Sequence, residues 1–295
     1  MTDQPAAKKE QLVAELKKMG IKAGDALMVH SSFKSLGPVD GGPEAVIDAF
    51  LEVLTPKGLF VVPALTATFA NSSWEQMRLY SYDPKETPSR VGVITDKAWR
   101  RPNAFRSNHP THSIAAIGNR AQELAKGDSL RTFDKNGPYG RYVKWGANLF
   151  FLGTTLGCNT TLHVAEDWAE LPYMEQDVPV KVKNVDGSTR IEKVAMSPNG
   201  HRNFYAPDDK SPIVKVFYDR GLIREGKLAN AQVRLIGARD VMNTALQLFY
   251  DDPAFLLCEN PECAFCLKGR RECLEQLPRI RQTIDRLKAD GWCSF

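Results

Sequence analysis

The feature that most constrains the fold is an alternation of short apolar runs with a helical segment. An apolar run of strand length covers 26–30, a helical pattern with Pro43 in its first turn covers 43–54, and a second apolar run covers 59–63. Continuous apolar runs of this length are typical of strands that are buried on both faces. The strand, helix, strand order therefore predicts an α/β sheet that helices cover on both sides.

The rest of the chain continues this pattern and predicts one domain. The stretch 64–112 is rich in Pro, Ser, Asn and Arg, and loop-rich stretches of this length in compact domains are usually functional. Because no internal repeat or low-complexity linker is found, we expect one domain over 1–252 and an extension, 253–295, packed on it. Further helices are expected at 8–19, near 92–100, and at 119–126, 210–222 and 239–250, strands at 113–117 and 149–152, and a hairpin at 178–194 around Asp186-Gly187.

Composition and charge exclude several classes of function. The 295 residues are 43% hydrophobic and 25% charged, and the basic residues behind the formal net charge of +4 are spread along the chain. So small and scattered an excess does not favour a nucleic-acid partner, although it weakly helps a polyanionic ligand. No run approaches the ~18 apolar residues of a spanning helix, and residues 1–20 hold no apolar signal-peptide core. We expect a cytoplasmic protein with no membrane partner.

A histidine and a glutamate three residues apart form the first candidate catalytic group. His163 and Glu166 fall within TTLHVAEDWAEL, which is expected to form a helix that begins near Thr160, just after a strand. Side chains three apart share a helix face, so Glu166 can orient the imidazole of His163 and stabilise its protonated form, as a general base requires. Asp167 and Glu170 add negative charge, which suits a cationic substrate. A surface histidine paired with a glutamate by accident fits the spacing equally well.

The loop that follows the first apolar run is the second candidate site. Its backbone N–H groups, its hydroxyls and Lys34 can cradle a pyrophosphate at the point where the loop leaves a strand. Neither a Walker spacing nor GxGxxG is present, so an ordinary strand-to-helix loop stays open as an interpretation. The loop consists of His30, Ser31, Ser32, Phe33, Lys34, Ser35, Leu36 and Gly37.

Two histidines in the segment 106–113 form a third group. His109 and His112 are three residues apart, but neither HExxH spacing nor a cluster of acidic residues accompanies them. A catalytic zinc is therefore not favoured at this segment. His109 precedes Pro110, which holds it extended. We expect it to shape a pocket wall or to hydrogen-bond the backbone.

The C-terminal extension carries a cysteine cluster with one CxxC pair. Four thiols within sixteen residues can enclose a tetrahedral zinc, and reduced thiols that pack a small helical tail are an equally good interpretation. An iron–sulfur cluster is a third alternative. In each case the extension is expected to be structural rather than catalytic. The four residues are Cys258, Cys263, Cys266 and Cys273.

Taken in order, these pieces resemble the aminoglycoside 3-N-acetyltransferase family. The resemblance extends from about residue 9 to residue 252, and the order and spacing of the stretches are more specific than any one of them. The matching stretches are Val29-His30-Ser31-Ser32, Leu36-Gly37, Gly41-Gly42, Asp83-Pro84, Thr87-Pro88-Ser89, Gly92, Arg106-Ser107-Asn108-His109-Pro110, Ser113, Gly137-Pro138-Tyr139-Gly140, Leu152-Gly153 and Asn159-Thr160-Thr161-Leu162-His163-Val164-Ala165-Glu166.

The resemblance implies a three-layer α/β/α fold peculiar to the family and unlike the GNAT acetyltransferases, with an acetyltransferase domain over 1–252. It implies acetyl-CoA as donor and an aminoglycoside amine as acceptor, at the 3-amino position of the 2-deoxystreptamine ring. It further implies direct transfer in a ternary complex, with His163 as general base and Glu166 as its support. A hydroxyl would stabilise the oxyanion, and Thr161, Thr154 and Thr155 are the candidates.

The resemblance also assigns binding residues. The loop from His30 to Gly37, together with Ser107 and His109, is implied to hold the coenzyme. The acceptor is a small-molecule amine, bound by a monomer or a homodimer. Its candidate contacts are Asp83, Asn159, Asp167, Glu170 and His201.

Two segments depart from the family pattern. Residues 195–205 and the extension after Asp252 are not features of the resistance enzymes. His201, Arg202 and Asn203 stand where a wall of the acceptor pocket is expected, and their cationic and polar character suits a polyamine poorly. A non-aminoglycoside amine therefore stays open as the acceptor. So does a zinc-binding protein that has kept the fold and lost the activity.

Overall fold

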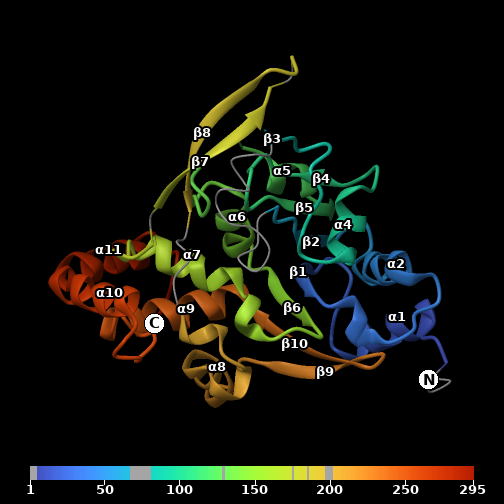
Figure 1. The fold of residues 1–295 in the computed structure, drawn as a ribbon. Coiled ribbons are helices and arrows are strands. Elements are labelled where there is room, and N and C mark those ends of the chain that lie inside the picture. The colour runs from blue at the N-terminus through green and yellow to red at the C-terminus, as the bar shows by residue number, and fades with distance from the viewer. Residues whose placement is uncertain (1–4, 67–80, 128–129, 175, 185, 197–201) are drawn as a thin grey trace.

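A seven-stranded sheet forms the middle of the computed structural model, which describes residues 5–66, 81–127, 130–174, 176–184, 186–196 and 202–295 (Figure 1). The strand order is β4-β5-β2-β1-β6-β10-β9, and the sheet is mixed. β1 pairs in parallel with β2 and β6, whereas β5 and β10 pair antiparallel on either side of these three. The strands are β1 (Ala26–Ser31), β2 (Leu59–Pro63), β4 (Phe105–Arg106), β5 (Ile114–Gly118), β6 (Asn148–Leu152), β9 (Arg224–Leu228) and β10 (Ala231–Gly237).

Side chains on the two faces of this sheet belong to two separate apolar clusters. Met28 of β1 lies in one cluster and its neighbours Leu27 and Val29 lie in the other, as the period of two along a strand requires. The sheet is therefore the middle layer of an α/β/α sandwich, as predicted. Helices α1 (Lys9–Lys18), α2 (Gly42–Leu54) and α4 (Val93–Trp99) supply the Leu27 side, and α5 (Ala121–Ala125), α6 (Pro138–Lys144), α7 (Thr160–Trp168), α8 (Pro212–Asp219) and α9 (Ala238–Asp251) supply the other.

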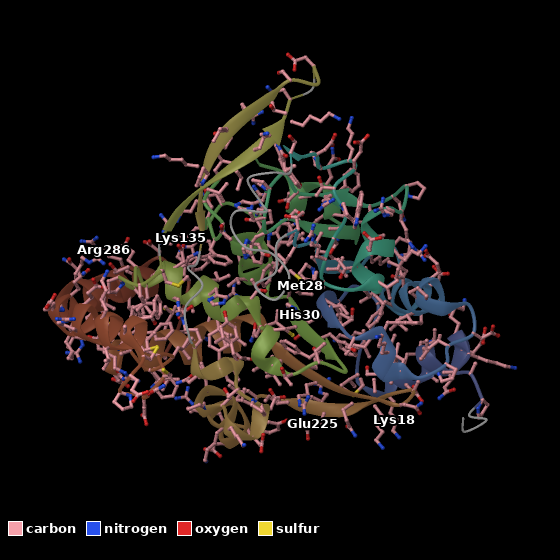
Figure 2. All side chains as sticks on the ribbon, in the orientation of Figure 1. Lys18, Met28, His30, Lys135, Glu225 and Arg286 are labelled. Atoms are coloured by element: carbon pink, nitrogen blue, oxygen red, sulfur yellow. The ribbon has the colours of Figure 1, made fainter. Side chains whose placement is uncertain are left out.

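The side chains in Figure 2 follow the same layering. Met28 and His30 of β1 are labelled in the middle of the molecule, and both are buried. The labelled charged residues Lys18, Lys135 and Glu225 lie toward its outline. The buried middle strand thus carries His30 to the edge of the sheet at which the chain leaves β1.

A smaller sheet of three strands stands beside the main one. β3 (Ser81–Tyr82) pairs with β7 (Gln176–Lys183), which forms a hairpin with β8 (Thr189–Met196) that extends away from the sandwich (Figure 1). The predicted turn is confirmed, because Asp186 Oδ1 accepts a hydrogen bond from the Ser188 amide at 2.9 Å.

The Cys-rich extension forms two helices, α10 (Ala264–Glu275) and α11 (Leu277–Ala289). Cys273, Ile280 and Ile284 join the apolar cluster on the α7 side of the sheet. The extension is therefore continuous with that core, and the division at 252 remains a prediction.

Several functional candidates gather at one edge of the main sheet. The parallel strands β1 and β6 end beside each other at Ser31 and Leu152, and β2 ends at Pro63 opposite Ile114. The loop after Ser31, the turn at Gly153 and the segment before Ile114 therefore share this edge. Ligand sites of α/β sheets lie at the carboxyl ends of parallel strands.

Candidate active site

Helix α7 begins at this edge and carries the predicted catalytic pair. The chain leaves β6 at Leu152, passes the short helix η2 (Leu156–Cys158), and enters α7 after Asn159. Asn159 Oδ1 accepts a hydrogen bond from the Thr161 amide at 3.1 Å, so Asn159 is the N-cap of α7. The first turn of the helix is thereby fixed, and His163 follows it directly.

His163 is held through both of its ring nitrogens. Nδ1 lies 2.6 Å from Glu166 Oε2, which is an acceptor, and Nε2 lies 2.8 Å from the Tyr205 hydroxyl. Nδ1 therefore carries the proton in the neutral ring, and Nε2 accepts from Tyr205. His163 is 9% exposed and Glu166 is fully buried, so the pair is no accident of a solvated helix face. The predicted contact between His163 and Glu166 is confirmed, while the role of His163 as base stays a prediction.

The second oxygen of Glu166 binds an arginine that the sequence does not link to it. Arg202 Nε donates to Glu166 Oε1 at 2.7 Å, and both side chains are fully buried. Burial alone would raise the pKa of Glu166, but the charge of Arg202 and the hydrogen bond from His163 outweigh it and lower this pKa below its ordinary value. Glu166 therefore stays ionised at neutral pH. Arg202 lies behind the catalytic pair, so its expected place on an open pocket wall is wrong.

Aromatic rings enclose the imidazole of His163. The rings of Phe204, Tyr205 and Phe133 lie 5.3, 6.1 and 6.3 Å from it between centroids. The Phe133 ring also lies 5.9 Å from that of His112, which joins α7 to the segment 109–112. An imidazole in such surroundings is shielded from bulk water, which strengthens its interaction with Glu166.

The side chain of His109 hydrogen-bonds the backbone of its own segment, which is one of the two roles expected from the sequence. Its Nδ1 accepts hydrogen bonds from the amides of Thr111 at 3.3 Å and His112 at 3.0 Å. His109, Ser107 and His112 line a cavity of about 270 Å³, so His109 is also part of a pocket wall. Ser107 Oγ accepts from the Ile114 amide at 2.9 Å. Their predicted contacts with the coenzyme remain predictions.

Acid is expected to destabilise this protein between pH 6.5 and about 4. Burial lowers the pKa of His30 and of His109 to about 4 each, and it also lowers the pKa of His112. Unfolded histidines titrate near pH 6.5, so below that pH the unfolded chain binds more protons than the folded one. The free energy of unfolding then falls by up to about 1.4 kcal/mol per pH unit for each histidine. Urea unfolding at pH 7.5 and pH 5.0 measures this loss, and equal stabilities would contradict it.

The loop after β1 is held at both of its ends. Ser35 Oγ donates to the Ser32 carbonyl at 2.6 Å, and the Ser32 amide donates to Leu152 O at 2.8 Å. Leu36 is fully buried in the core, so it anchors the loop rather than facing a ligand with its side chain. Ser31 Oγ is buried without a hydrogen-bond partner among the described residues. An orphaned hydroxyl at this edge is what a ligand contact would satisfy.

Gly153 lets this loop approach the end of β6. Its φ is 60°, and a Cβ placed on it would lie 1.7 Å from Ser35 Oγ. We expect Gly153→Ala to cost about 1 kcal/mol for the backbone conformation and more for the displaced Ser35, and to weaken coenzyme A binding. Gly221→Ala is the matched control, because Gly221 has φ 64° and open space around it. Urea unfolding and calorimetric titration with coenzyme A compare the two, and equal losses would contradict the close approach.

Comparison with known proteins decides the family. A family model described as Aminoglycoside 3-N-acetyltransferase matches residues 28–250. The chain belongs to this family. The match covers the loop after β1 and the whole of α7, and it ends within α9, before the Cys-rich extension. The family is one of acyltransferases that includes antibiotic-resistance enzymes, as the resemblance implied.

Relatives match over most of their length. Aminoglycoside N(3)-acetyltransferase IV of Salmonella sp. is 29% identical over 261 residues, which cover 85% of this chain and 90% of the relative. A similar solved structure is that of aminoglycoside acetyltransferase AAC(3)-IVa, a histidine-to-alanine mutant in complex with a gentamicin. It is 28% identical to this chain with a TM-score of 0.79, and the match covers 92% of this chain and 100% of that chain. AAC-IIIb in a binary complex with CoASH has 24% identity and a TM-score of 0.73, covering 84% and 97% of the two chains, and shows the same fold.

In this aminoglycoside 3-N-acetyltransferase family member, each of two acidic residues is paired with an arginine. Both were expected to contact a cationic substrate. Asp167 accepts from Arg131 at 3.2 Å, and Glu170 accepts from Arg279 at 3.3 Å. All four side chains line a cavity of about 240 Å³. An acceptor amine would therefore compete with arginines for these carboxylates.

The remaining predicted residues of this family member are dispersed. Thr161 is fully buried, and its hydroxyl lies 2.6 Å from that of Tyr142, so its oxyanion role remains a prediction. Asp83 forms an ion pair with Lys183 at 3.2 Å and lines a cavity of about 460 Å³ below the small sheet. Asn159 caps α7, and its Nδ2 is buried without a partner among the described residues. His201 lies outside the described residues.

The extension that follows the family match brings three cysteines together. The sulfur atoms of Cys258, Cys263 and Cys266 all lie within 4.8 Å of one another. Cys273 is not part of this group, because its thiol is directed at Pro253 O, 3.7 Å away. Cys273, the fourth cysteine of the predicted set, lies about two helical turns from Cys266 along α10 and is buried in the core, and its part in a metal site stays a prediction. All six cysteines of the chain are reduced.

Within the described residues, no helix is both long and apolar enough to cross a bilayer.

Proposed function

We propose that the protein transfers the acetyl group of acetyl-CoA to an amine of an aminoglycoside, at the 3-amino position of the 2-deoxystreptamine ring. This proposal rests on one observation in a member of the aminoglycoside 3-N-acetyltransferase family. The buried Glu166 orients His163 through Nδ1, which leaves the other ring nitrogen, Nε2, as a hydrogen-bond acceptor. An amine must lose a proton as it attacks a thioester, and this arrangement supplies the base.

The proton path follows from the two hydrogen bonds of His163. Nε2 receives the proton of the attacking amine once the Tyr205 hydroxyl has rotated away from it. The imidazolium that forms is stabilised by Glu166 through Nδ1–H, and Glu166 remains ionised because Arg202 lowers its pKa. In direct transfer the amine nitrogen bonds to the acetyl carbonyl carbon and the C–S bond of acetyl-CoA breaks. The departing thiolate takes the proton from the His163 imidazolium and leaves as the coenzyme A thiol, so no acyl-enzyme forms. A donor aimed at the thioester oxygen completes the site.

The edge of the parallel strands fits the coenzyme. The buried Ser31 hydroxyl and the Asn159 amide nitrogen there have no hydrogen-bond partner among the described residues. They supply two contacts for a polar ligand, and Lys34 supplies a charge for its phosphates. The binary complex of AAC-IIIb with CoASH supports this choice of donor. We expect the reaction to take place in the cytoplasm.

The acceptor is tested with purified protein and acetyl-CoA. Thiol release is measured with a panel of gentamicin, apramycin and sisomicin, chosen because solved relatives bind them, and NMR of the product identifies the acetylated nitrogen. Acetylation at the 3-amino group is expected. Coenzyme A binding without turnover of any aminoglycoside would overturn this acceptor and favour another small-molecule amine.

We propose that the extension binds zinc through three cysteine ligands. Thiolates in a CxxC pair with a third sulfur nearby are ligands that zinc prefers, and Cys258, Cys263 and Cys266 satisfy this chemistry.

A further inference from the structure

We propose that metal binding at Cys258, Cys263 and Cys266 holds Arg202 in place, and that the extension thereby positions the catalytic pair Glu166 and His163. The inference rests on the proposed function, since it gives the extension a part in the chemistry of His163. It departs from the expectation that the extension is purely structural.

The three thiols form a compact donor set. In a tetrahedral zinc site the Zn–S distance of about 2.3 Å places sulfur atoms about 3.8 Å apart. The sulfur atoms here lie within 4.8 Å of one another, so a contraction of at most about 1 Å brings them to that separation. Arg270 of α10 joins this helix to the backbone at Cys258, because its Nη2 donates to Leu257 O at 2.6 Å and to Cys258 O at 3.1 Å.

Two parts of the extension contact Arg202. Phe265, at the start of α10, lies in sequence between Cys263 and Cys266, and its ring is 5.3 Å from the Arg202 guanidinium carbon. Leu257, which precedes Cys258, forms an antiparallel bridge with Arg202. A metal that fixes the three cysteines therefore fixes both contacts.

The next residue is held by the extension as well. The Asn203 amide donates to Leu256 O at 2.9 Å, and its side chain donates to Phe255 O at 2.6 Å. The segment 202–205 is thus attached to the backbone just before Cys258. Outside the extension, the Tyr173 ring lies 4.6 Å from the Arg202 guanidinium carbon, so the extension supplies one of the two sides that hold this segment.

The segment 202–205 supplies two of the three aromatic rings around His163. Arg202 binds the far oxygen of Glu166, the Phe204 ring packs against the imidazole, and the Tyr205 hydroxyl contacts Nε2. A shift of this segment would change the partners of both His163 nitrogens together. Arg202 is accordingly a positioning residue, and the extension is its support.

The first experiment tests metal binding. Elemental analysis of the purified full-length protein should give about one zinc per chain, and Cys266→Ser should abolish it. Cys293→Ser is the matched control, because Cys293 is another buried thiol of the extension outside the cluster, and it should keep the metal. X-ray absorption should show three sulfur ligands and one nitrogen or oxygen. Absence of metal, or four sulfurs, would overturn the three-thiol site.

The second experiment tests positioning without relying on turnover. The proton on His163 Nδ1, which bonds Glu166 at 2.6 Å, should give a far-downfield NMR resonance in the zinc-bound protein. Chelation of the metal, or Cys266→Ser, should broaden or shift this resonance while the rest of the spectrum stays folded. An unchanged resonance in folded, metal-free protein would overturn the coupling, even if the proposed acetyl transfer itself failed.

Kinetics separate positioning from a general loss of structure. Removal of the metal should lower kcat by about tenfold or more and change the KM for acetyl-CoA by less than about threefold. Arg202→Met should do the same, and Arg202→Lys should recover part of kcat because it keeps a charge for Glu166. Equal effects on kcat and KM, or no recovery in Arg202→Lys, would contradict a positioning role.

Discussion

Replacing His163 by alanine is expected to lower kcat for acetyl transfer by about a thousandfold. Without the imidazole no group fixed by Glu166 accepts the proton of the attacking amine, while the coenzyme contacts proposed for the loop after β1 are left intact. Stopped assays of acetylated product with saturating acetyl-CoA and gentamicin measure the change.

Binding provides the control for this variant. Calorimetric titration should give the same coenzyme A affinity for His163→Ala as for the parent protein, because the predicted phosphate contacts lie in the loop 30–37. A kcat within about threefold of the parent, with binding intact, would remove His163 from the role of base.

Replacing Glu166 by glutamine is expected to affect stability and activity together. Glu166 and Arg202 are both fully buried, and their charges compensate each other at 2.7 Å. Glu166→Gln leaves the arginine charge buried without its partner, which typically costs about 3–5 kcal/mol. It also removes the charge that stabilises the imidazolium, so kcat should fall by about a hundredfold. Urea unfolding and steady-state kinetics measure the two effects.

A double variant separates the two effects of Glu166. In Glu166→Gln combined with Arg202→Met, no buried charge remains unpaired, so most of the lost stability should return. The activity should stay low, because no carboxylate faces Nδ1 of His163. A double variant as unstable as Glu166→Gln alone would show that packing, rather than charge, holds this pair.

The parts of the structure that the sequence predicts are those with local signals. The strand 59–63 is a continuous apolar run, and the hairpin follows from Asp186-Gly187, so both are found where expected. The contact of His163 with Glu166 needs only helical spacing. The strands β9 and β10 were not predicted. REGKL of β9 is mostly polar and lies at the sheet edge. In β10 the alternation of the buried Ala231, Val233 and Leu235 with less buried residues is a signal that could have found the strand.

Long-range partners are the parts that the sequence does not predict. Arg202 and Tyr205 lie 36 and 42 residues from their partners in α7, and no spacing rule joins such positions. The same reason explains the acidic residues: Asp167 and Glu170 look available in the sequence, but Arg131 and Arg279 approach them in the fold. Arg279 belongs to the extension and Arg131 to the segment before α6, so only the folded chain brings these charges together.

A crystal structure of the His163→Ala variant with coenzyme A and an aminoglycoside bound together tests the role of His163 most directly. We expect the coenzyme sulfur and the 3-amino nitrogen to lie within about 4 Å of each other, beside the space left by the Nε2 side of the imidazole. A coenzyme whose thiol ends at another edge of the sheet, or an aminoglycoside that presents no amine to that space, would contradict it.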